Sequence, residues 1–150
     1  MKRILIAEND LSFAESIVDV LEKEGFRALV SANESEAMEI VQDDRIDLVI
    51  LDAELPGAGG YSMCIRLKNT LSLGTIPVIL ISSEATAEVF QKHRMFKDRA
   101  DEYFLKPFKP VDLIPVVKRL LVAGDGGRVA DENGGQEVCE DDIIEEKDIV

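Results

Sequence analysis

The sequence has few of the residues that build disulfide frameworks and metal clusters, and it has no long apolar run. It contains one histidine, no tryptophan and two cysteines, Cys64 and Cys139. The two cysteines lie far apart in the chain, which argues against a disulfide framework and fits a reducing compartment. No apolar run approaches the roughly 20 residues of a membrane-spanning helix, and the N-terminal run meets an acid after four residues. We therefore expect a cytoplasmic protein with neither a transmembrane helix nor a signal peptide.

Basic residues are also in the minority. The chain has 17 Lys and Arg against 30 Asp and Glu, which gives a net charge of −13. A polyanion repels such a chain at long range, so the composition argues against binding to nucleic acid. Much of the negative charge lies in residues 124–150, which are rich in glycine and acid and show no apolar periodicity. They predict a disordered acidic tail, or a linker to a further domain, after a domain of residues 1–123.

Five short apolar runs alternate with five helical patterns. Four of the runs are continuous and aliphatic, which is typical of strands that are covered on both faces in a parallel sheet. Strand–helix alternation repeated five times predicts a doubly wound α/β fold, with a five-stranded parallel sheet and right-handed crossovers. The expected strands are residues 4–7, 28–30, 47–51, 78–81 and 103–105, and the expected helices are residues 12–24, 34–42, 61–69, 85–96 and 111–122.

Local signals predict how the first and last helices begin. Ser12 followed by Glu15 is a capping-box pattern, so Ser12 is the expected cap of the first helix. Pro115 removes the backbone hydrogen bond back to Val111, so it predicts a kink in the first turns of the last helix.

The carboxyl ends of the expected strands carry polar residues. In a parallel α/β sheet these ends meet at one edge, where ligands bind. The residues gathered there would be Glu8, Asn9, Asp10, Asp52, Ser82, Ser83, Lys106 and Pro107.

This set supports phosphoryl chemistry. Clustered carboxylates repel one another, and a hard cation such as Mg²⁺ relieves the repulsion through oxygen ligands. Asp52 could then attack a phosphoryl group and form an acyl phosphate. Lys106 would supply a positive charge to the phosphoryl oxygens, and Ser82 a hydrogen bond. Taken alone, Glu8 to Asp10 would be interpreted as a solvated turn and helix cap, and Asp52 could likewise be a turn residue.

Four motifs in order resemble the response-regulator receiver domain of the CheY-like, flavodoxin-like type. They are ILIAEND, DLVILDAELPG, PVILISS and DEYFLKPF, and the resemblance covers residues 2–122. It implies that Asp52 is the phosphoacceptor, Ser82 the switch hydroxyl and Lys106 the phosphate-binding lysine. It also implies that Tyr103 is the switch aromatic, although plain packing explains that residue equally well.

The resemblance implies a Mg²⁺ site and a backbone feature as well. Glu8 and Asn9 match the pair of metal-site acids, and the backbone carbonyl of Glu54 matches a third protein ligand beside Asp52. A cis bond between Lys106 and Pro107 is implied too. Asn9 departs from the pattern, because the family usually has an acid there, so the metal would bind more weakly.

The resemblance leaves two functions open. One is a two-component receiver that a histidine kinase or a phosphotransfer protein phosphorylates, and that changes a protein-binding face made by the fourth helix, fifth strand and fifth helix. The other is a phosphorylation-independent interaction module, because QKHRMFKDRADEY resembles a segment of the FrzS-type pseudo-receivers of gliding motility. An enzyme is disfavoured, since the chain has no Gly-rich phosphate loop, second acid–base pair or triad.

The fourth helical pattern carries a run of basic residues. It is either a solvated face or a docking face for an acidic partner or for the chain's own tail. We expect His93 to be exposed, and no other residue is spaced to bind a metal with it. The basic residues are Lys92, Arg94, Lys97 and Arg99.

Overall fold

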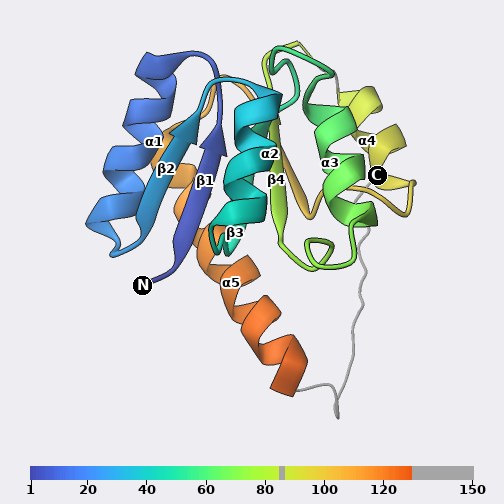
Figure 1. The fold of residues 1–150 in the computed structure, drawn as a ribbon. Helices are drawn as coiled ribbons and strands as arrows, with labels where there is room; N and C mark the ends of the chain where they lie inside the picture. Colours follow the sequence, from blue (N-terminus) through green and yellow to red (C-terminus); the bar gives the residue numbers. More distant parts are fainter. Residues whose placement is uncertain (85–86, 130–150) are drawn as a thin grey trace.

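A computed structural model describes residues 1–84 and 87–129. Five parallel strands form one sheet in the order β2-β1-β3-β4-β5 (Figure 1). In this order β1 lies beside the central strand β3. The chain adds β2 on the outer side of β1 and then β4 and β5 on the other side of β3, as expected for a doubly wound fold. The strands are β1 (Arg3–Ala7), β2 (Arg27–Ser31), β3 (Leu48–Asp52), β4 (Val78–Ser82) and β5 (Glu102–Leu105).

Helices cover both faces of the sheet. Successive strand residues point to opposite faces, so the continuous aliphatic runs feed two separate cores. Ile4, Ile6 and Ile50 pack with α1 and α5, whereas Leu5 and Leu51 pack with α2, α3 and α4. The helices are α1 (Leu11–Lys23), α2 (Glu34–Asp43), α3 (Gly60–Asn69), α4 (Ala87–Arg94) and α5 (Leu113–Val129), with a 3₁₀ turn, η1 (Pro110–Asp112), before α5. The predicted fold class is therefore confirmed.

The expected N-cap of α1 was wrong by two residues. Asp10, not Ser12, is the N-cap, because its Oδ1 accepts a hydrogen bond of 3.2 Å from the backbone N–H of Phe13. A cap must lie just before the first helical residue, and the helix begins at Leu11. Ser12 is instead an exposed residue of the first turn.

Two expectations about α5 also change. Pro115 is the third residue of the helix and follows η1, so its missing N–H falls in the first turn, where no helical partner exists. The predicted cause of a kink is therefore absent. The helix also runs to Val129, so residues 124–129 are helical rather than part of a tail. The remainder of the expected tail, residues 130–150, lies outside the described residues, as do residues 85–86 of the expected fourth helix.

No helix in residues 1–84 and 87–129 is long and apolar enough to cross a lipid bilayer.

Candidate functional site

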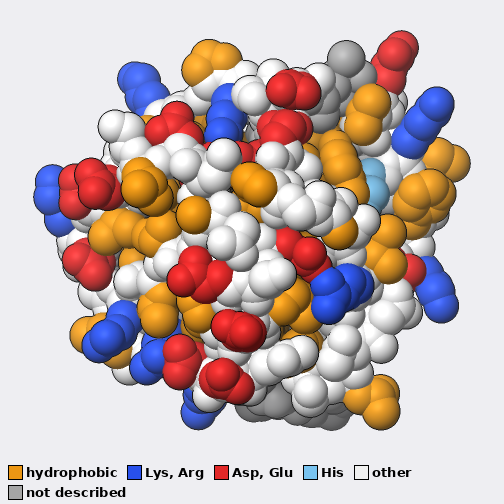
Figure 2. Space-filling view, turned by 45° about the horizontal axis from the view of Figure 1, so that its top comes forward, with side chains coloured by type: hydrophobic (Ala, Val, Ile, Leu, Met, Phe, Trp, Pro, Cys, Tyr) orange, Lys and Arg blue, Asp and Glu red, His pale blue; other side chains and the backbone are white. Residues whose placement is uncertain are grey.

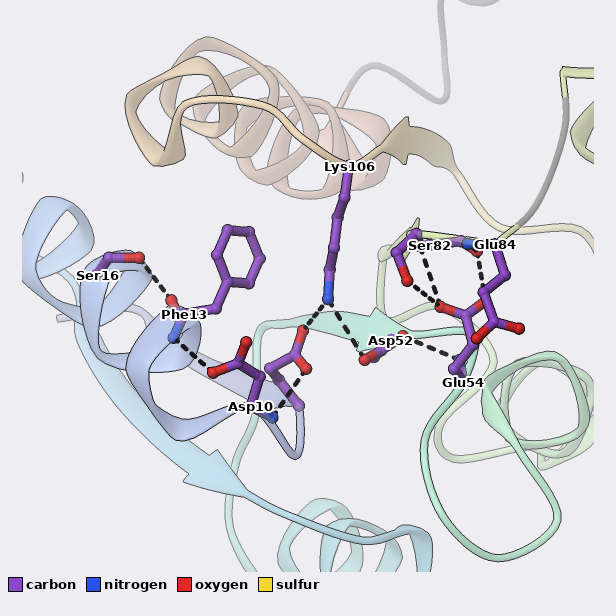
Figure 3. A network of polar contacts seen from close by, with 10 residues as sticks. Asp10, Phe13, Ser16, Asp52, Glu54, Ser82, Glu84 and Lys106 are labelled. Carbon is purple, nitrogen blue, oxygen red and sulfur yellow. Dashed lines mark hydrogen bonds and ion pairs between the residues drawn. The ribbon is translucent and has the colours of Figure 1, made fainter.

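The sheet brings four of the predicted residues to one edge. Ala7 lies beside Leu51, Asp52 beside Ile81, and Ser82 beside Leu105 in neighbouring strands. This register aligns the strand ends, so the residues that follow or end the strands converge. They are Glu8 after β1, Asp52 of β3, Ser82 of β4 and Lys106 after β5, and Figure 3 labels the last three.

Lys106 lies between two buried carboxylates. Its Nζ donates a hydrogen bond of 2.9 Å to Glu8 Oε1 and lies 3.6 Å from Asp52 Oδ2. Glu8 is 1% exposed and Asp52 is 3% exposed. The ammonium also lies 4.7 Å from the ring centre of Phe13, a cation–π contact that holds the lysine over the site. One cation therefore compensates two carboxylates that water hardly reaches.

The pKa values of Asp52 and Lys106 reflect the excess of one negative charge in this group. Burial raises the pKa of Asp52, and the adjacent Glu8 raises that pKa further, while Lys106 lowers it. Burial lowers the pKa of Lys106, but the hydrogen bond to Glu8 and the charge of Asp52 outweigh burial and raise that pKa overall. A hard divalent cation binds to carboxylate oxygens and reduces the repulsion between two crowded carboxylates. The chemistry of Glu8 and Asp52 therefore fits Mg²⁺. Among the described residues no three His, Cys, Asp or Glu side chains form a metal-binding group.

The loop after β1 holds Glu8 in place. The backbone N–H of Asp10 donates a hydrogen bond of 3.0 Å to Glu8 Oε2, which leaves the other carboxylate oxygen for Lys106. Asn9 between them is exposed to solvent and lies outside the hydrogen-bonded set that the described part of the chain forms at this edge. The structure thus joins Glu8 to the site directly, and Asn9 only through its position in the chain.

The turn after β3 contributes a side chain that the motif comparison did not assign. The backbone N–H of Glu54 donates to Asp52 Oδ1 at 2.9 Å. The carboxylate of Glu54 accepts a hydrogen bond from the Ser82 hydroxyl and another, of 3.0 Å, from the backbone N–H of Ser83. Only the carbonyl of Glu54 was expected to matter. The sequence signal that could have identified this side chain is the acid two residues after Asp52, because a residue so close to the end of β3 lies at the same edge of the sheet.

Tyr103 belongs to a buried cluster under α4. Its hydroxyl accepts a hydrogen bond of 3.0 Å from the backbone N–H of Ala100 and is hydrogen-bonded to Nδ1 of His93. Either group can donate in the Tyr103–His93 bond, because the tyrosine oxygen can accept a second hydrogen bond and the neutral imidazole carries its proton on one of its two nitrogens. Burial lowers the pKa of His93, which favours the neutral form.

The expectation that His93 is exposed was wrong. The side chain is 5% exposed, because it lies three residues after the buried Phe90 and so shares the inward face of α4. The rings of Tyr61 and Tyr103 lie 5.0 and 5.6 Å from the imidazole ring. A lone histidine in a basic run gives no sign of this, since its partners come from α3 and β5.

The outer side of the same region is apolar and basic. Met95 and Phe96 are 82% and 57% exposed. The neighbouring basic side chains are also exposed, namely Lys92, Arg94, Lys97 and Arg99. Arg94 also covers the ring of Tyr103 at 4.7 Å. In Figure 2 the single histidine, in pale blue, lies near the right edge among hydrophobic side chains.

Sequence comparison relates most of the chain to one family. The family model described as the response regulator receiver domain matches residues 4–118. The DNA-binding response regulator MtrA of Mycolicibacterium paratuberculosis is 34% identical over 125 residues, which cover 83% of this chain and 53% of MtrA. The phosphate regulon transcriptional regulatory protein PhoB of Pseudomonas aeruginosa is 33% identical over 120 residues, covering 80% and 52%. The chain spans about half the length of these curated relatives.

Solved structures agree in fold. A CheY-like response regulator receiver domain protein from Methanospirillum hungatei has a TM-score of 0.75 at 25% identity, and the match covers 84% of this chain and 98% of that one. The signal receiver domain of a signal transduction histidine kinase from Syntrophus aciditrophicus has a TM-score of 0.73 at 35% identity, with coverage of 82% and 92%. The Lys106–Pro107 peptide bond is cis, as the resemblance implied.

Proposed function

Because this chain belongs to the response-regulator receiver domain family, we propose that Asp52 accepts a phosphoryl group from a histidine kinase or a phosphotransfer protein. The observation that carries the proposal is the buried Asp52 carboxylate at the end of β3, 3.6 Å from Nζ of Lys106. In the reaction a carboxylate oxygen of Asp52 forms a bond to phosphorus. The bond from phosphorus to the donor's nitrogen or oxygen breaks, and the leaving group keeps the electron pair.

The neighbouring residues have distinct roles in this proposal. Lys106 stays within ion-pair distance of Asp52 and balances the negative charge of the transferred group. The Ser82 hydroxyl, buried on the adjacent strand, donates a hydrogen bond to a phosphoryl oxygen once its present acceptor is displaced. In this proposal the chain is a phosphoacceptor that takes part in its own phosphorylation and dephosphorylation rather than an enzyme.

Mg²⁺ is the metal that this site would take. Glu8, Asn9, Asp52 and the backbone carbonyl of Glu54 would hold it, and its charge stabilises the phosphoryl oxygens when it is bound. Asn9 offers a neutral oxygen where a carboxylate would offer a charge, so we propose weak binding.

The output surface that we propose is the face made by α4, β5 and α5. Met95 and Phe96 supply exposed apolar area there, and the neighbouring basic residues attract an acidic protein partner. MtrA is named as a DNA-binding protein. DNA binding is not proposed for this chain, because its net charge of −13 opposes it.

The test is the mass of the protein after incubation with acetyl phosphate and Mg²⁺. We expect a gain of about 80 Da, the mass of one phosphoryl group, in the wild type and none in Asp52→Ala. If the folded wild type gains no mass, the proposal fails.

A phosphorylation-independent interaction module is the second candidate. The observation that favours it is the hydrogen bonding of Tyr103, whose buried hydroxyl is held by His93 and Ala100 of the chain itself. A residue fixed in this way needs no phosphoryl group to keep its position. The similarity to FrzS-type pseudo-receivers stays a prediction. This function would be selected if the protein gained no mass in the experiment above and if cells that carry the Asp52→Ala variant kept the same binding of the protein partner as wild-type cells.

A further inference from the structure

The carboxylate of Glu54 lies at the switch serine. Its Oε2 accepts the hydrogen bond of the Ser82 hydroxyl, and its Oε1 accepts from the backbone N–H of Ser83 at 3.0 Å. Oε1 also lies 3.4 Å from the Ser83 hydroxyl. Figure 3 shows the Glu54 side chain turned toward Ser82. The end of β4 is therefore bound to the turn after β3 by one carboxylate.

This contact occupies the proton that phosphoryl recognition requires. A serine hydroxyl has a single proton to donate, so Ser82 cannot donate to Glu54 and to a phosphoryl oxygen at the same time. A carboxylate and a phosphoryl group are both anionic acceptors, and hydrogen bonds to charged acceptors are the stronger kind. The Ser82 side chain is fully buried, so water offers it no easy alternative to the two acceptors.

Glu54 is also tied to the phosphoacceptor itself. Its backbone N–H donates to Asp52 Oδ1 at 2.9 Å, so the carboxylate belongs to the same tight turn as the reacting group.

We propose that Glu54 is a positioning residue whose carboxylate competes with the phosphoryl group for the Ser82 hydroxyl, and that it thereby slows phosphorylation of Asp52. This inference rests on the proposed function, since it concerns the regulation of the same site. Glu54 takes no part in bond making. It must release Ser82 before the phosphorylated state is complete, so its removal favours that state.

The experiment compares phosphorylation rates in a graded series of variants. Each protein is incubated with acetyl phosphate and Mg²⁺, and the gain in mass is followed with time. Glu54→Gln keeps the size and a neutral acceptor but loses the charge, and we expect a rate increase of about fivefold to tenfold. Glu54→Ala removes the acceptor altogether and should increase the rate at least as much. Urea unfolding of both variants checks that the fold is retained.

Glu84→Gln is the matched control. Glu84 is an acid at the same strand end, but its contact with Ser82 is a hydrogen bond of 3.1 Å from its backbone N–H, which the substitution keeps. We expect its rate to stay within about twofold of the wild type. In a Ser82→Ala background, Glu54→Gln should no longer increase the rate, because the hydroxyl that the two acceptors share is gone.

The outcomes separate this inference from the proposed function. Acceleration in Glu54→Gln that disappears in the Ser82→Ala background supports it. Phosphoryl uptake by the wild type with no acceleration in Glu54→Gln overturns the inference alone, as does equal acceleration in Glu84→Gln, which would indicate a general effect of charge. If neither the wild type nor Glu54→Gln gains mass, both the inference and the proposed function are overturned.

Discussion

Lys106→Met is expected to destabilise the fold in a pH-dependent manner. The substitution keeps the apolar length of the side chain and removes the ammonium that lies 2.9 Å from Glu8 and 3.6 Å from Asp52. Both carboxylates are almost completely buried, so water cannot replace the lost charge. Breaking a buried ion pair from one side is costly for this reason.

The size of the effect follows from the distances and from protonation. At an effective dielectric constant of about 20, the two attractions are worth roughly 5 to 6 kcal/mol each, less the cost of burying the lysine. The penalty on the two buried carboxylates that lose the ammonium is limited, because Asp52 can take up a proton. Bringing a carboxyl group with the ordinary pKa of 3.8 to its neutral form at pH 7 costs about 4 kcal/mol. We expect a loss of about 2 to 4 kcal/mol at pH 7.

The loss should shrink as the pH falls. In the variant the pKa of Asp52 rises further, because the lysine that lowered it is gone. Between the unfolded and the folded pKa values the native state binds one more proton than the unfolded state, so stability decreases with rising pH by about 1.4 kcal/mol per unit. The difference from the wild type is therefore largest at neutral pH and small near pH 4.

Urea unfolding at pH 5 and pH 7 measures this difference. Lys118→Met is the matched control, because Lys118 pairs with Glu24 at a similar 2.7 Å but is 54% exposed, and its loss should cost less than about 1 kcal/mol. A Lys106→Met protein that loses less than about 1 kcal/mol at pH 7, or the same amount at both pH values, would refute the reasoning. Lys106 would then serve only the phosphoryl group.

Three further substitutions test other parts of the site. Asp52→Asn should raise the free energy of unfolding at pH 7 and less so near pH 4, because burial raises the pKa of this carboxyl and the ionised form destabilises the fold; equal stability of both proteins at pH 7 would contradict this. Gly60→Ala should cost about 3 kcal/mol or prevent folding, since its Cβ would lie 2.2 Å from the carbonyl oxygen of Asp52, and a thermal transition near that of the wild type would exclude such crowding. Tyr103→Phe should cost about 1 to 3 kcal/mol in urea unfolding, because it removes the hydroxyl that His93 contacts, and a neutral result would mean that this bond contributes nothing.

The fold could be predicted from the sequence because its signals are local. A continuous aliphatic run such as residues 48–51 identifies a strand that is buried on both faces, whatever the rest of the chain does. Helical periodicity between such runs then fixes the alternation, and handedness allows few topologies. Convergence of Asp52 and Lys106 follows from the same reasoning, because each ends or follows a strand of one parallel sheet.

The ends of the elements were less predictable, since competing local signals had to be resolved. Asp10 and Ser12 are both good caps, and only the point at which β1 gives way to α1 selects Asp10. The glycines after residue 123 have low helix propensity, yet α5 continues to Val129.

The side-chain partners were decided by the tertiary structure. His93 and Tyr103 meet because α4 packs over β5, and Glu54 reaches Ser82 because the turn after β3 folds toward the end of β4. Such contacts depend on the register of neighbouring strands and on the rotation of a helix about its axis. No pattern of period 2 or 3.6 in one segment contains that information, because the pattern says which face is buried but not which residue of another segment will be buried against it.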